Sequence, residues 1–167
     1  AFASRFNGVA VDDSTELVCA STIDTFQILL WSFTTGQLLE VLSGHSAVIS
    51  SLDFCMQATL VSGSWDSTVR LWDMSRREFS CEVIPHSCDV IAVAASRDNK
   101  QLAVSTTGQK VAFWKVEGSK LLGTVDYSRD VPRINGNDSN FVALQYNPSG
   151  SMLICSTSAA LICIYDP

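Results

Sequence analysis

Short runs of alternating apolar and polar residues recur along the whole chain, separated by Gly, Asp, Asn and Ser. The runs are rich in β-branched residues, which favour strands, and no stretch keeps the 3.6-residue period of a helix. We expect strands near 6–11, 16–21, 26–32, 37–42, 47–54, 59–64, 68–73, 78–84, 89–95, 101–105, 110–115, 120–125, 141–146, 152–157 and 161–165. The pattern therefore predicts an all-β chain with fifteen strands.

Four apolar segments end alike and reveal an internal repeat. They read ILLWSF at 28–33, VRLWDM at 69–74, VAFWKV at 111–116 and ICIYDP at 162–167. Their aromatic residues are spaced by 41, 42 and 51 residues, at Trp31, Trp72, Trp114 and Tyr165. A period of about 40–45 residues with four strands per repeat resembles the WD40 β-propeller family. The resemblance implies a partial propeller of nearly four four-stranded antiparallel blades from a larger ring.

The repeat also predicts how the chain is divided. We expect blades at 1–42, 43–85 and 86–125, and an incomplete blade at 141–167. The last interval between aromatic residues is longer than the others, so it should hold an insertion. Residues 126–140 contain Pro, Gly and three Asn, which is typical of a loop.

The second repeat carries His45, Asp66, Trp72 and a serine at either Ser62 or Ser64. In WD40 repeats these residue types form a hydrogen-bonded chain from Trp through Ser and His to Asp, so the resemblance implies a structural tetrad. Such a chain would satisfy an indole N–H that is buried. The alternative is a catalytic triad, which needs an exposed nucleophile beside an oxyanion site, and the sequence has no GxSxG. We expect no catalytic, cofactor-binding or metal-binding residues.

The other repeats carry less complete sets. The first has Asp24 at the corresponding turn, and the third has His86 but no turn Asp. The fourth has Ala159-Ala160 at this turn and no Gly-His. The second blade should therefore be the most firmly held.

Three residues are candidates for interaction. Trp65 precedes the turn Asp, a position that WD40 proteins present on the face used for binding, although its ring could instead lie over its own blade. Arg129 and Arg133 lie in the expected insertion loop.

Composition narrows the possible functions. The net charge of −6 and the pI of about 4.7 argue against a large phosphate-binding surface, which needs clustered Lys and Arg. No apolar run approaches the roughly 18 residues of a membrane span. The six cysteines form no CxxC pair. We interpret them as buried apolar residues in a reduced compartment; a disulfide framework or a zinc site is the alternative.

A longer order of features resembles the periodic tryptophan protein 2 family. It begins with Asp24-Thr25-Phe26 and ILLWSFTTGQLLEVLSGH, and continues through LVSGSWDSTVRLWDM, SCDVIAVA and QLAVSTTGQKVAFW. DYSRDV then opens the insertion, and FVALQYNPSGSMLICSTSAALICIYD closes the chain with Tyr-Asp in place of Trp-Asp. The insertion is shorter than in the family and has fewer basic residues.

The resemblance implies a nucleolar scaffold of the small-subunit processome, which matures small-subunit ribosomal RNA. The expected partners are other tandem-propeller processome proteins, with pre-ribosomal RNA and small nucleolar RNA contacted indirectly. We expect no membrane and no small-molecule substrate. A WD40 adaptor of another assembly, such as a ubiquitin-ligase receptor, coat or signalling scaffold, is the alternative. An enzyme is the third hypothesis.

Propellers close with roughly four to eight blades, so fifteen strands would leave an open arc. Its terminal blades would expose apolar faces and open edges, which favour pairing. We expect this piece to self-associate or to be unstable in isolation.

Overall fold

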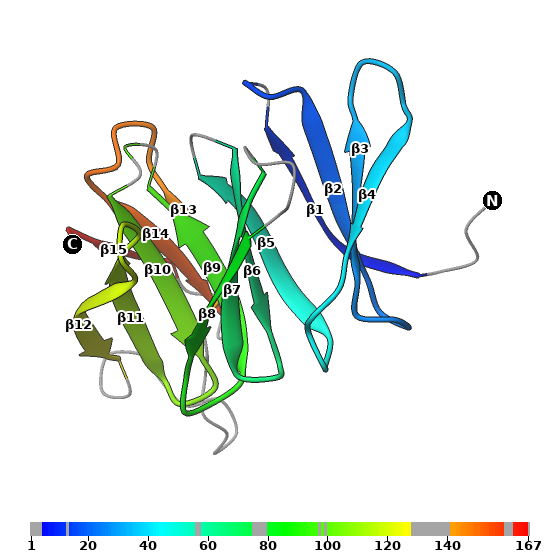
Figure 1. Cartoon of the computed structure of the whole chain (residues 1–167). Helices are drawn as coiled ribbons and strands as arrows, with labels where there is room; N and C mark the ends of the chain where they lie inside the picture. The colour runs from blue at the N-terminus through cyan, green and yellow to red at the C-terminus, as the bar shows by residue number, and fades with distance from the viewer. Residues whose placement is uncertain are drawn as a thin grey trace.

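A computed structural model describes residues 5–12, 14–55, 58–74, 80–96, 98, 100–127, 141–158 and 162–166. These residues form fifteen strands in four antiparallel sheets and no helix (Figure 1). The strands are β1 (Phe6–Asp12), β2 (Leu17–Thr22), β3 (Ile28–Ser32), β4 (Leu38–Leu42), β5 (Ile49–Cys55), β6 (Thr59–Ser64), β7 (Thr68–Asp73), β8 (Ser80–Pro85), β9 (Val90–Ala95), β10 (Gln101–Thr106), β11 (Lys110–Lys115), β12 (Lys120–Asp126), β13 (Phe141–Tyr146), β14 (Leu153–Thr157) and β15 (Ile162–Tyr165).

Each sheet is a meander in which strands consecutive in the sequence pair side by side. The orders are β1-β2-β3-β4, β5-β6-β7-β8, β9-β10-β11-β12 and β13-β14-β15. In Figure 1 the sheets stand next to one another, with the β6–β7 and β10–β11 turns at the lower end. Meanders arrayed in this way are blades, so the partial propeller predicted from the repeats is confirmed.

The apolar core lies between the blades. Cys19, Leu30, Ile49, Leu60 and Trp72 fill the first interface, where the first blade meets the second. Other buried residues fill the next interface, among them Val61, Val69, Val93, Leu102 and Val104. Because each sheet buries both faces in this arrangement, its inner strands read as nearly continuous apolar runs.

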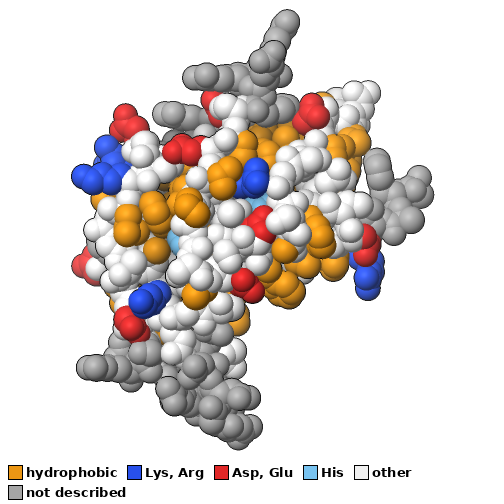
Figure 2. All heavy atoms as spheres, turned by 60° about the horizontal axis from the view of Figure 1, so that its bottom comes forward, with side chains coloured by type: hydrophobic (Ala, Val, Ile, Leu, Met, Phe, Trp, Pro, Cys, Tyr) orange, Lys and Arg blue, Asp and Glu red, His pale blue; other side chains and the backbone are white. Residues whose placement is uncertain are grey.

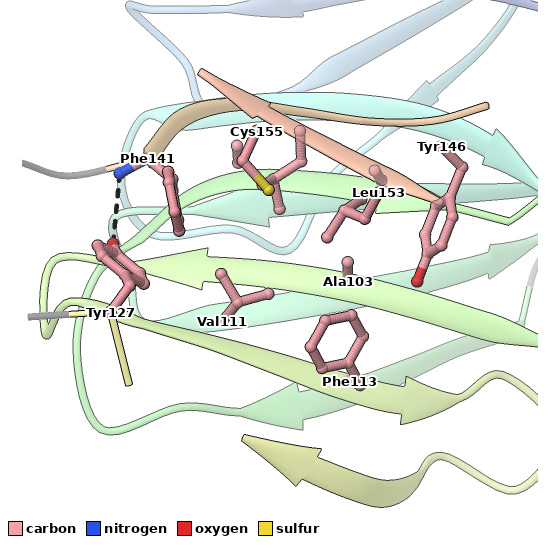
Figure 3. Packing of buried hydrophobic residues seen from close by; sticks show 11 residues of the cluster. Ala103, Val111, Phe113, Tyr127, Phe141, Tyr146, Leu153 and Cys155 are labelled. Atoms are coloured by element: carbon pink, nitrogen blue, oxygen red, sulfur yellow. Dashed lines mark hydrogen bonds between the residues drawn. The ribbon is translucent and has the colours of Figure 1, made fainter. Parts of the chain in front are cut away.

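The interface between the third and fourth blades is built around aromatic residues (Figure 3). Tyr127 and Phe141 are fully buried, with ring centroids 3.9 Å apart. The Phe141 N–H donates to the Tyr127 hydroxyl at 3.3 Å, as the dashed line in Figure 3 shows. These two residues flank the expected insertion, so both of its ends are anchored in the core. Arg129 and Arg133 lie outside the described residues.

Polar side chains also link the inner strands of neighbouring blades. Ser50 donates to the Val90 carbonyl at 2.7 Å, and the Asp53 carboxylate accepts from the Ala95 N–H at 2.8 Å. Each backbone group would otherwise be an unpaired edge group of β9, which would be costly when partly buried. Gly63 permits the close approach here, because a Cβ at this position would lie 2.6 Å from a methyl carbon of Val90.

Observed strand ends differ from the expected ones by a residue or two. The largest physical difference is at β5, which begins at Ile49 instead of near 47. Residues 45–48 instead form a loop tied to the β6–β7 turn: the Trp65 N–H donates to the Val48 carbonyl, and the Ser64 hydroxyl donates to that of Ala47. In the described part of the chain, no helix is long and apolar enough to cross a membrane.

All six cysteines are described as free thiols. Burial raises the pKa values of Cys19, Cys55 and Cys155 to about 12, so these thiols stay protonated at neutral pH. The described residues hold no group of three or more His, Cys, Asp or Glu side chains that could bind a metal ion.

Candidate functional site

The β6–β7 turn places Asp66 at the lower end of the second blade. The Asp66 N–H donates to the Ser64 hydroxyl at 3.1 Å. Its carboxylate accepts from the Thr68 N–H at 3.0 Å and from the Thr68 hydroxyl at 2.6 Å. Ser67 closes the turn with φ of 62°, a conformation that non-glycine residues seldom adopt. The aspartate therefore fixes the turn that presents it.

His45 joins this turn to the middle of the sheet. Its Nδ1 lies 2.8 Å from the second carboxylate oxygen of Asp66, which also accepts from the Ser46 N–H at 3.0 Å. Its Nε2 lies 2.7 Å from the Ser62 hydroxyl oxygen. The Trp72 indole N–H donates to that same oxygen at 2.9 Å. Four side chains thus form one chain of hydrogen bonds from Trp72 through Ser62 and His45 to Asp66.

The direction of the protons follows from burial. Burial lowers the pKa of His45 more than the neighbouring Asp66 raises it, so the imidazole is neutral at neutral pH. For Asp66, hydrogen bonds from Thr68, His45 and Ser46 outweigh the raising effect of burial and hold its pKa below the usual value. His45 then donates from Nδ1 to the carboxylate and accepts at Nε2 from the Ser62 hydroxyl. Every polar atom along the chain has a partner.

The network's geometry suits structural support better than nucleophilic catalysis. Ser62 is fully buried, and the His45 side chain is 1% exposed. The Ser62 hydroxyl already accepts from the indole and donates to the imidazole, so a substrate would have to displace packed side chains to reach it.

Ser64 has a different role from Ser62. Its hydroxyl donates to the Ala47 carbonyl at 3.2 Å and accepts from the Asp66 N–H. It therefore ties the β4–β5 loop to the turn, while Ser62 carries the chain to Trp72.

Arg70 is a further part of this site, which sequence reasoning missed. It donates to the Gly44 carbonyl at 2.9 Å, and its guanidinium carbon lies 5.8 Å from the centre of the Trp72 ring. A Cβ at Gly44 would lie 2.5 Å from an Arg70 nitrogen, so glycine is required for this approach. The Gly-His pair itself is the signal, since a glycine next to a buried histidine marks a close contact.

The third blade keeps the two ends of a similar arrangement but lacks the middle. The His86 and Trp114 rings meet edge to face, with centroids 5.5 Å apart. Their buried Nε2 and Nε1 atoms have no hydrogen-bond partner among the described residues. Val104 occupies the position that Ser62 holds in the second blade: each lies two residues beyond the residue opposite the tryptophan in the strand ladder. Burial lowers the pKa of His86.

The first blade has a different contact at its turn. Asp24 forms an ion pair with Arg5 at 3.2 Å, and hydrogen bonds from the Arg5 backbone and side chain lower the pKa of Asp24. Both side chains are largely exposed, so this pair contributes little stability. In the fourth blade, Ala159 and Ala160 lie outside the described residues.

Trp65 lies apart from the buried chain, at the surface. Its residue is 53% exposed, while its N–H holds the Val48 carbonyl at 3.0 Å. The backbone is thus fixed and the ring faces solvent over about half of its surface.

Comparison with known proteins agrees with this geometry. The family described as "WD domain, G-beta repeat" matches residues 36–73, which include His45, Ser62, Asp66 and Trp72. Four antiparallel sheets, repeated aromatic strand ends and the tetrad of the second blade define the class: the chain is a WD40-repeat protein.

The particular resemblance is to periodic tryptophan protein 2. The chain is 36% identical to the homolog of Schizosaccharomyces pombe over 97% of its own length and 20% of the relative. Identity is 35% to the protein of Saccharomyces cerevisiae and 36% to that of Arabidopsis thaliana, in each case over 97% of this chain and 19% of the relative. The chain therefore closely resembles periodic tryptophan protein 2 along nearly its whole length. It spans about a fifth of the length of these curated relatives.

Proposed function

We propose that the chain acts within a scaffold of the small-subunit processome, in pre-ribosomal RNA processing and small ribosomal subunit biogenesis. The observation that carries the proposal is the similarity to periodic tryptophan protein 2, which covers 97% of the chain and so includes all four blades. The WD40 class favours a scaffold over an enzyme, and the burial of Ser62 and His45 supports that choice.

The proposed partners are other tandem-propeller proteins of the same particle, in the nucleolus. The net charge of −6 favours protein contacts over direct contacts with phosphate, so the proposed association with pre-ribosomal RNA and small nucleolar RNA is indirect.

Affinity purification tests this proposal. The tagged full-length protein would be purified from growing cells, and the recovered proteins and RNA would be identified by mass spectrometry and sequencing. Recovery of tandem-propeller processome proteins together with early pre-ribosomal RNA is the expected result. Recovery of ubiquitin-ligase, coat or signalling subunits without that RNA would instead assign the chain to a different WD40 assembly.

A further inference from the structure

Trp65 stands on a turn that is rigid without it. The Trp65 N–H donates to the Val48 carbonyl, and the Ser67 N–H donates to the Ser64 carbonyl at 3.2 Å. Asp66, between them, is held by Thr68 and His45. The Trp65 indole makes no hydrogen bond with the residues that the structure describes, so its side chain adds nothing visible to this network. An exposed tryptophan on a rigid backbone can bind a partner with little loss of conformational entropy, because the turn is already ordered.

A carboxylate lies at the same turn. Ser67, two residues after Trp65, donates from its hydroxyl to Asp89 at 3.2 Å. Asp89 is exposed, and its backbone carbonyl accepts from the Thr107 N–H, which fixes its position. Within the described ranges Asp89 forms no ion pair, whereas Asp24 of the neighbouring blade is paired with Arg5. The turn thus combines an aromatic ring with an unneutralised negative charge.

Figure 2 brings the lower end of Figure 1 toward the viewer. In the middle of this view, acidic side chains lie directly beside hydrophobic ones. A cation attracted by a carboxylate can also lie over the face of a tryptophan, so the two groups would favour the same charged side chain. A nucleic acid strand could stack on the ring, but its phosphates would be repelled by Asp89.

We infer that Trp65 and Asp89 form a docking site for a basic segment of a partner protein, with an Arg or Lys side chain over the indole and paired to the carboxylate. The inference rests on the proposed scaffold function, for which it names the chemistry of one partner. Its failure would leave that function standing, because other surfaces of the blades could carry the contacts.

The test measures binding of the full-length protein to an array of random heptapeptides in which one position is held as Arg, Lys, Gln, Leu or Glu. We expect Arg and Lys peptides to bind at least about tenfold better than Gln peptides. Trp65→Ala and Asp89→Asn should each remove most of this preference. Phe33→Ala is the matched control, because Phe33 is an aromatic residue that is 68% exposed and lies just beyond β3, at the opposite end of its strand from the β2–β3 turn.

Thermal melts of the same variants establish that they fold, which is expected because Trp65 holds the turn through its backbone. No preference for basic peptides, or a preference that survives both Trp65→Ala and Asp89→Asn, would overturn the inference. Binding of a 12-nucleotide single-stranded RNA that depends on Trp65 would overturn it as well, in favour of a stacking site for nucleic acid.

Discussion

At the scale of single residues, the second blade depends on a buried histidine whose two nitrogens are both bonded. His45 reaches Asp66 at one nitrogen and Ser62 at the other, and Ser62 passes the chain to Trp72. A severed buried network leaves several polar groups unsatisfied at once, so its loss costs more than a single hydrogen bond.

His45→Ala should therefore lower the free energy of unfolding by about 2–4 kcal/mol, since it strips partners from both Ser62 and Asp66. His86→Ala is the matched control: His86 is also largely buried and lies against a tryptophan, but its Nε2 has no partner among the described residues. Chemical denaturation of both variants in the full-length protein makes the comparison. Equal losses would show that the hydrogen bonds of His45 contribute nothing beyond packing.

Both histidines should also make stability depend on pH. Burial holds their folded-state pKa values below the ordinary value of 6.5, so the unfolded chain takes up protons first as the pH falls. Stability is therefore full above about pH 6.5 and decreases as the pH falls below it. Asp66 adds a further loss at lower pH, because its folded pKa also lies below its usual value.

The measurement is the free energy of unfolding at pH 7.5 and at pH 5.5, in the wild type and in a variant with both histidines replaced by Gln. The chain has two histidines, so the variant should be less stable overall but nearly insensitive to pH in this window. An unchanged pH dependence in the variant would assign the effect to carboxylates instead.

At the scale of elements, strands and turns could be predicted from the sequence because each blade repeats one alternating pattern with one aromatic end. The choice between Ser62 and Ser64 could not, since residues two apart point to the same face of a strand. The register decides it: Leu60 lies opposite Trp72, which brings Ser62 beside the indole. The links from Ser50 and Asp53 to β9 were also missed, because they depend on the spacing between blades.

The third blade offers a test of the same register argument. Val104→Thr would place a hydroxyl where the buried Trp114 and His86 nitrogens have no described partner, at nearly constant volume. We expect stability within about 0.5 kcal/mol of the wild type or above it, because the new hydroxyl gains partners.

Val61→Thr is the control for this substitution. Val61 is equally buried, in the same cluster, and a hydroxyl there would lie among apolar side chains, costing about 1–3 kcal/mol. Thermal denaturation of the two variants decides the matter. Similar losses in both would mean that the position of Val104 does not correspond to that of Ser62.

At the scale of the whole molecule, the first and last blades each present an apolar face. Val9 and Val11 of β1 are 65% and 49% exposed, and Ile162 and Ile164 of β15 are 73% and 64% exposed. Residues at these positions in the inner blades are covered by a neighbouring sheet. Exposed apolar faces beside open strand edges favour association.

The 167-residue chain in isolation should therefore form oligomers that light scattering detects at micromolar concentration. Replacing Ile162 and Ile164 with Lys should reduce their size, because charges on an outer face oppose stacking. A monodisperse, stable monomer of the unaltered chain would contradict this view of the terminal faces.

The central claim is that these blades belong to a scaffold for small-subunit ribosome assembly, and the most direct measurement is of ribosomal RNA after depletion of the full-length protein. Northern analysis would follow small-subunit and large-subunit ribosomal RNA in the same cells. The account predicts that precursors of small-subunit RNA accumulate and its mature form declines, while large-subunit RNA is maintained. Unchanged processing of small-subunit RNA would contradict it.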